Sequence, residues 1–218
     1  MKKVQLTNHY LLERSKLLAR YAENWPRKAD KLELHLDDPY CGLIKMHFKV
    51  NDEETLLITA SNVYEPFVDI REWLEQIVRH IFDFTTSAVK INDEFDDYLL
   101  FYEPIYHHPD EMLLNPPVLG GLFYVYDSCE KKIVSEAFLE TKKFVKSIYE
   151  SIHSYAIEKS RNDEFVDAWS EGAYHYDFDD WDEHDPRFIN LFVEKVTSPI
   201  VEEFLGNEDS TTRFIPIK

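Results

Sequence analysis

The sequence predicts an α+β fold in which helices pack on one face of a mostly antiparallel sheet. Three observations lead to this class. Apolar residues make up 44% of the 218 positions and aromatic residues 15%, enough for a substantial core. The apolar periodicity gives the order helix, three strands, helix, three strands, helix. Polar turns join most of the strands directly, so hairpins outnumber the crossovers that a parallel sheet needs.

The first element is a helix over residues 7–24, with Thr7 or Asn8 as its N-cap and Trp25-Pro26 at its end. Three strands follow at residues 32–36, 44–50 and 55–60. The middle strand has the clearest alternation of apolar and polar residues, and residues 37–42 and 51–54 supply the turns.

A long helix from Pro66 to Phe84 is the element around which the chain is organised. Proline suits the first helical turn, and Glu75 and Arg79 are spaced as an i,i+4 ion pair. One face is apolar along its whole length, and its stripe is formed by Phe67, Ile70, Leu74, Ile77, Ile81 and Phe84. This face requires a sheet or other helices to cover it.

The second set of strands is predicted at residues 88–91, 98–102 and 121–127, with a proline-rich surface loop between Glu103 and Leu119. Ser135 is the expected cap of a helix that runs to Lys159. The buried stripe of this helix is expected to be Phe138, Val145, Ile148, Ile152 and Tyr155.

The chain changes character after this helix. Residues 1–160 are therefore predicted to form the α+β domain, and residues 161–218 an acidic, aromatic-rich, helical C-terminal extension packed on it. Residues 1–160 hold 19 Lys and Arg against 27 Asp and Glu, whereas residues 161–218 hold 5 against 15. The extension thus carries −10 of the net charge of −18.

This charge restricts the classes of partner. A negative surface repels nucleic-acid phosphates and anionic lipid and attracts basic proteins or cations. We therefore expect a basic protein as the partner, and we expect binding to neither nucleic acid nor membranes. The sequence has no apolar run long enough to span a membrane and no signal-peptide core at its start, which favours the cytoplasm. Cys41 and Cys129 are expected to be reduced core thiols.

Several common active sites are excluded by their motifs. With five glycines in all, the chain has no dinucleotide-binding or P-loop glycine pattern. It also lacks the G-x-S-x-G elbow of serine hydrolases and the H-E-x-x-H helix of zinc proteases. No catalytic residue and no cofactor are predicted.

The strongest local feature is a segment with six carboxylates between Asp177 and Asp185, interleaved with aromatic residues. Carboxylates at this density repel one another, which favours a cationic partner. Aromatic side chains would anchor such a partner while the acids steer it. The predicted partner-binding residues are Tyr174, Tyr176, Asp177, Phe178, Asp179, Asp180, Trp181, Asp182 and Glu183.

The same segment offers a second reading, a transition-metal site formed by His175, His184 and Asp185. A calcium loop is excluded, because Asp182 stands where such a loop needs glycine and Phe188 where it needs glutamate. A third reading is an exposed acidic connection whose aromatic residues pack back on the core.

Three weaker candidates lie elsewhere in the chain. His107 and His108 occur in the proline-rich loop beside Asp110 and Glu111, and the acidic residues between Asp93 and Asp97 could pair for acid–base chemistry. His47 is expected to be a surface residue on the polar face of its strand.

The stretch from Leu56 through Ile77, followed by Asp93-Glu94 and the strand at Tyr98, resembles small bacterial α+β proteins of the toxin-immunity type. The resemblance covers residues 43–102. It implies an α+β fold and the neutralisation of a toxin, and it carries no catalytic residues with it.

The leading functional hypothesis is a non-enzymatic binding protein, an immunity-type inhibitor in its narrower form, that docks on a basic protein. A metal-assisted hydrolase using His175, His184 and Asp185 is the first alternative. A small-molecule-binding module is the second. The sequence does not determine the oligomeric state.

Overall fold

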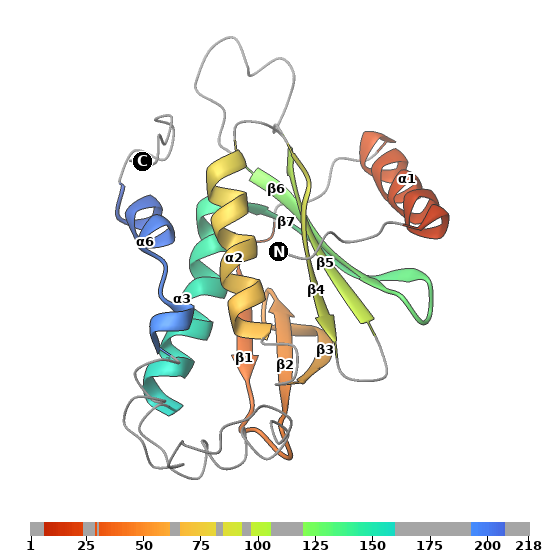
Figure 1. The fold of residues 1–218 in the computed structure, drawn as a ribbon. Helices are drawn as coiled ribbons and strands as arrows, with labels where there is room; N and C mark the ends of the chain where they lie inside the picture. Colours follow the sequence, from red (N-terminus) through yellow and green to blue (C-terminus); the bar gives the residue numbers. More distant parts are fainter. Residues whose placement is uncertain are drawn as a thin grey trace.

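The computed structural model describes residues 7–23, 29, 31–61, 66–81, 85–92, 97–105, 120–159 and 193–207. Two antiparallel sheets lie beside helices that pack on them (Figure 1), which confirms the α+β class. The elements in chain order are α1 (Asn8–Glu23), β1 (Leu32–Leu36), β2 (Leu43–Val50), β3 (Glu53–Ser61), α2 (Pro66–His80), β4 (Ser87–Asn92), β5 (Asp97–Ile105), β6 (Gly120–Asp127), β7 (Lys132–Glu140), α3 (Thr141–Lys159) and α6 (Pro199–Gly206).

The first sheet has three strands in the order β1-β2-β3, as the alternating pattern predicts. Ile44, Met46 and Phe48 of β2 are at most 1% exposed, while Lys45 between them faces solvent. A two-residue turn joins β2 to β3, and both of its residues, Asn51 and Asp52, have positive φ. Turns of this kind match the twist of the strands that they join.

The second sheet has four strands in the order β4-β5-β6-β7. Every residue of β6 is buried, because this strand has a neighbour on each side and helices over both faces. Strand β5 continues past its predicted end and includes Pro104, which lies opposite Gly121. Proline is tolerated there because β4 stops pairing at Tyr102, so beyond that point β5 is paired with β6 alone.

The prediction of a helix from Ser135 is wrong for its first residues. Ser135 lies in β7, opposite Val125 of β6, and α3 begins only at Thr141. The nine residues of β7 complete a hairpin with β6. Their backbone hydrogen bonds to β6 outweigh the helical spacing of their apolar residues. Phe138 is buried in this strand, whereas the helical part of the predicted stripe (Val145, Ile148, Ile152 and Tyr155) is buried as expected.

The central helix α2 follows the prediction closely. It begins at Pro66 and ends at His80, earlier than expected, and Ile81 is a buried turn residue. Phe84 lies outside the described residues. The expected pair is present, with Arg79 Nη2 3.6 Å from Glu75 Oε2.

The four-stranded sheet separates two clusters of buried side chains. On one face, β5 and β6 pack against α2 and α3, with Phe123 close to both Trp73 and Phe144. The helix α1 covers the opposite face, where the ring of Tyr10 stacks on Phe101 at 4.5 Å. Helices therefore occupy both faces of this sheet, and Figure 1 shows α1 on the far side of it from α2 and α3.

Polar contacts fix α1 on its face of the sheet. The Arg14 guanidinium donates from Nε to Glu103 Oε2 at 3.0 Å and from Nη2 to Glu103 Oε1 at 2.5 Å. Beside this pair, the hydroxyls of Tyr10 and Tyr124 share a hydrogen bond of 2.8 Å. These buried and partly buried contacts give the docking of α1 a defined register.

Residues 193–207 run antiparallel along α3. Thr197 contacts His153, the Glu202 carboxylate accepts from Tyr149, and the Asn207 carbonyl accepts from Lys142. Apolar side chains of this segment enter the main core, namely Val196, Val201 and Phe204. This part of the predicted extension thus packs on the α+β domain, while a boundary at residue 160 stays a prediction.

Candidate functional site

All the predicted site residues fall between residues 160 and 192, outside the described residues. These are the partner-binding residues Tyr174, Tyr176, Asp177, Phe178, Asp179, Asp180, Trp181, Asp182 and Glu183, and the metal candidates His175, His184 and Asp185. His107, His108, Asp93 and Glu94 also fall outside them. The docking surface and the metal site therefore stay predictions.

The structure does locate Lys159 and Val193, the two described residues that flank residues 160–192. Lys159 is the last residue of α3. Because residues 193–207 run back along α3 from its C-terminal half, Val193 also lies towards the C-terminal end of that helix. Both attachment points are therefore at one end of the molecule, beside the end of β1.

Three carboxylates gather at this end, and we refer to Asp37, Asp38 and Glu158 as the acidic rim. Asp37 and Asp38 follow β1, and Glu158 comes from the last turn of α3, which packs along β1. Their side chains are exposed to 40%, 75% and 74%, respectively. The rim is thus accessible to a partner.

Lys159 pairs with two of these acids. Its ammonium lies 2.6 Å from Asp38 Oδ1 and 3.2 Å from Glu158 Oε1, and its side chain is only 15% exposed. The hydrogen bond to Asp38 is the main reason that the pKa of Lys159 is raised, so the amine stays charged. One ammonium cannot neutralise three carboxylates, and the rim keeps a negative excess.

A cavity of about 510 Å³ lies between the rim and the underlying helix. Leu34 and Leu36 of β1 form an apolar part of its wall, and Tyr155 of α3 lies beside them. The Tyr155 hydroxyl donates to the Asp37 carbonyl at 2.7 Å. Burial raises the pKa of Tyr155, and the rim carboxylates raise it further, so this hydroxyl remains a donor.

An exposed aromatic residue lies in the turn that follows the rim. Tyr40 is 79% exposed, although a large aromatic side chain usually finds cover in a soluble protein. Its backbone forms an isolated bridge with Leu43, which holds the turn close to β2. The described surface at this end therefore combines acids with an aromatic residue, as the predicted partner-binding segment does in its sequence.

Two histidines flank Asp37 on the outer face of the first sheet. Asp37 Oδ2 is 3.0 Å from His47 Nε2, and Asp37 Oδ1 is 3.6 Å from His35 Nε2. The centroids of the two imidazole rings are 6.0 Å apart. This separation favours a separate contact of each histidine with the carboxylate over a metal ion that both histidines would bind. Within the described parts of the chain, no three side chains form a group that could hold a metal ion. His47 lies on the polar face as expected, but these neighbours leave its side chain only 19% exposed.

The cysteines differ from expectation. Neither forms a disulfide, but both are exposed and neither is in the core. Cys41 is in the turn after β1 and Cys129 in the turn after β6, so both occupy connections and not the strands beside them.

The sequence pattern predicts Asp37 and Asp38 only as turn residues and predicts no role for Glu158. Local patterns do not reveal the rim, because the packing of α3 on β1 brings together residues that are far apart in the chain. The acidic composition of the following segment was the one indication that this end of the molecule carries charge.

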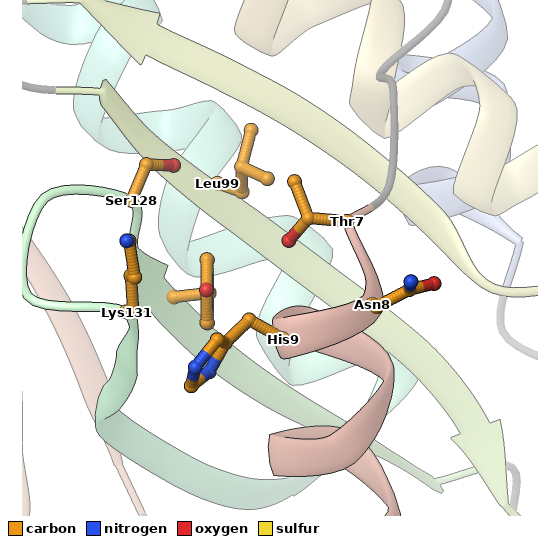
Figure 2. A pocket seen from close by; sticks show the side chains of 7 residues that line it. Thr7, Asn8, His9, Leu99, Ser128 and Lys131 are labelled. Carbon is orange, nitrogen blue, oxygen red and sulfur yellow. The ribbon is translucent and has the colours of Figure 1, made fainter.

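A second cavity, of about 340 Å³, lies beside the start of α1 and the turn between β6 and β7 (Figure 2). Among the described helices, none combines the length and the apolar character needed to cross a membrane.

Comparison of the chain with protein-family models, curated protein sequences and solved structures found no match.

Proposed function

We propose that the protein is a non-enzymatic binding protein that docks on a basic protein partner through the acidic rim and the adjoining acidic, aromatic segment 174–185. The observation that carries this proposal is the position of the rim. Its three exposed carboxylates lie at the end of α3, and the acidic segment follows that helix in the sequence.

The cavity under the rim suits a lysine or arginine side chain of the partner. The alkyl part of such a side chain packs on apolar walls, here Leu34, Leu36 and the ring of Tyr155, while its charged head reaches carboxylates. Hydrogen bonds between a charged donor and a carboxylate are stronger than neutral ones. A cationic side chain of the partner would also relieve the repulsion among Asp37, Asp38 and Glu158.

The charge of the whole chain supports fast association with such a partner. A net charge of −18 steers a basic protein towards the surface, and salt screens this attraction over about 8 Å at physiological ionic strength. The resemblance of residues 43–102 to immunity proteins makes a basic toxin the narrower form of the proposal. The broader form requires only a basic protein.

The test is affinity capture from the source cells with the full chain at low and at high salt, followed by titration of the captured protein. Two variants remove two charges each: Asp38→Asn with Glu158→Gln in the rim, and Asp179→Asn with Asp180→Asn in the segment. Both are expected to weaken binding at low salt by about tenfold or more, as loss of charge-assisted contacts does.

A matched control has the same charge change at the other end of the first sheet. Asp52→Asn with Glu53→Gln alters two exposed acids, one of which pairs with Lys31 as Asp38 pairs with Lys159. Affinity should stay within about twofold of the parent, because this turn is distant from the rim. Capture of partners that are not basic, or an equal loss in the control and the rim variant, would contradict the proposal.

A further inference from the structure

The outermost strand of the first sheet, β1, leaves backbone groups unpaired beside the acidic rim. Among the described strands only β2 pairs with it, and Figure 1 shows β1 at the outer side of this sheet, next to α3. In an antiparallel ladder, residues that bond to the neighbouring strand alternate with residues whose N–H and C=O groups point to the other side. We refer to this other side of β1 as the open edge.

The hydrogen bonds at the two ends of β1 determine which residues face the open edge. Asn51 N donates to the Lys31 carbonyl at 3.1 Å, and Asp37 N donates to the Lys45 carbonyl at 3.0 Å. The register between these two bonds is unbroken. The odd-numbered residues of β1 therefore bond to β2, and the even-numbered residues present their N–H and C=O groups to the open edge.

Two of the even-numbered residues, Leu34 and Leu36, keep these groups free. The carbonyl of Leu32, by contrast, accepts from the Ser147 hydroxyl of α3. Neither the N–H nor the carbonyl of Leu34 or Leu36 has a hydrogen-bond partner among the described residues. Both residues line the cavity of about 510 Å³ under the acidic rim, so the open edge borders this cavity.

The opposite wall of the cavity is formed by α3 and leaves room for an extended segment. Ser151 and Ser154, which line it there, have short side chains. The volume of the cavity is within the usual range of ligand sites. Asp37 and Asp38 of the rim follow Leu36 directly in the chain, so the negative charge is at one end of the open edge.

We propose that an extended segment of the basic partner adds to the open edge of β1 as a further strand, with a lysine or arginine of that segment against the acidic rim. This inference rests on the proposed function and specifies the form in which the partner binds. Main-chain hydrogen bonds to Leu34 and Leu36 supply affinity, because each of these residues offers one donor and one acceptor. The rim supplies the selection for positive charge.

Charge favours a segment of a basic partner over a second copy of this chain. Two copies paired through β1 would bring together two proteins of net charge −18, each with exposed carboxylates beside the edge. Their repulsion opposes such a dimer, whereas the same charge attracts a basic segment. Charged side chains commonly protect an edge strand from pairing with its own kind, and the rim does so here while admitting a cationic strand.

The test uses two capped synthetic peptides of three valines flanked by a lysine on each side, which places a lysine near the rim in either strand direction. The second peptide has every backbone N–H methylated, so it keeps its charge but donates no backbone hydrogen bond. Amide shifts of the full-length protein in NMR titrations give the dissociation constants. Amide hydrogen exchange then reports on the strand.

In the free protein, the amides of Leu34 and Leu36 should exchange faster than those of Glu33 and His35, which donate to β2. The first peptide, at ten times its dissociation constant, should slow exchange at Leu34 and Leu36 about tenfold. The methylated peptide at the same concentration should leave both rates unchanged, because it cannot complete the ladder.

Ser154→Leu should raise the dissociation constant of the first peptide about tenfold or more, because the larger side chain fills the cavity. Ser15→Leu is the matched control, since it makes the same change at an exposed serine of α1 that does not line the cavity. It should leave binding within about twofold of the parent.

Three outcomes would overturn strand addition. The first is equal affinity for the two peptides; if both are also weakened by Asp38→Asn with Glu158→Gln, the acidic docking surface would still stand. The second is slow exchange of Leu34 and Leu36 in a free monomer, which would mean that the chain's own residues occupy the edge. The third is slow exchange in a free dimer, measured by sedimentation, which would identify a second copy as the occupant.

The proposed function fails separately. If affinity capture recovers no basic protein, the docking function is overturned, while protection of Leu34 and Leu36 by the first peptide alone would still support strand addition at β1.

Discussion

Gly121 of β6 lies against the ring of Tyr102, so tightly that no other residue fits. A Cβ atom at this position would be 2.2 Å from Cζ of Tyr102. Tyr102 is fully buried, stacks on Phe144 and donates a hydrogen bond to Thr141 at the start of α3. The requirement for glycine is thus steric, and it links the centre of the sheet to the helix that follows.

Gly121→Ala is therefore expected to lower the free energy of unfolding by about 2–4 kcal/mol, because the Tyr102 ring must move and lose its hydrogen bond. Urea denaturation followed by circular dichroism measures this. Gly206→Ala is the control, since a Cβ there meets nothing within 4 Å. The double variant with Tyr102→Leu tests the cause. If its loss of unfolding free energy equals the sum of the losses in the two single variants, the clash with Tyr102 is not the cause.

At the scale of the element, α6 depends on Ser198. This residue is fully buried, and its hydroxyl donates to Glu75 of α2 at 2.8 Å and accepts from Val201 N at 3.3 Å, as an N-cap does. Its own N–H donates to the Tyr149 hydroxyl of α3. One side chain therefore begins α6 and fixes it to two other helices.

Ser198→Ala should lower the free energy of unfolding by about 1–2 kcal/mol. The helix α6 should then unfold locally, before the rest of the fold opens. Hydrogen exchange provides the test, with faster exchange expected at the amides of Val201 to Leu205 and unchanged exchange in β6. Glu203→Gln, an exposed change on the same helix, should leave both unchanged. Equal acceleration in α6 and β6 would mean that α6 is not a separate unit.

For the whole molecule, buried tyrosines determine the response to alkali. In each case burial is the largest reason that the pKa is raised, and for Tyr149 it reaches about 12. The tyrosines concerned are Tyr10, Tyr21, Tyr102, Tyr124, Tyr149 and Tyr155. In the unfolded chain a tyrosine releases its proton near pH 10. The folded state therefore holds more protons above that pH.

The contribution of these tyrosines to stability should accordingly be constant up to about pH 10 and fall above it, by about 1.4 kcal/mol per pH unit for each fully buried tyrosine such as Tyr102 and Tyr124. Urea unfolding at a series of pH values, with tyrosinate absorbance recorded in parallel, checks this. Tyr102→Phe should make the decline shallower. A midpoint that does not move above pH 10 would contradict the prediction.

The sequence predicts those parts of the fold that depend on residues close together in the chain, and it misses those that depend on contacts between distant residues. The strand at Ile44, Met46 and Phe48 and the helix from Pro66 were predictable because alternation and helical spacing are local. Residues 132–140 were not, because their pairing with β6 competes with a helical spacing that is also present. The acidic rim depends on the packing of α3 on β1. The cavity beside α1 depends on which face of the sheet that helix covers. Neither arrangement is encoded in a local pattern.

The position of α1 has one more consequence. Beneath this helix, β5 and β6 present a continuous set of apolar and aromatic side chains, Leu99, Phe101, Leu122, Tyr124 and Tyr126. An uncovered surface of this kind promotes self-association. The first helix therefore covers a surface that would otherwise be prone to aggregation, and the ion pair of Arg14 with Glu103 helps to keep it in place.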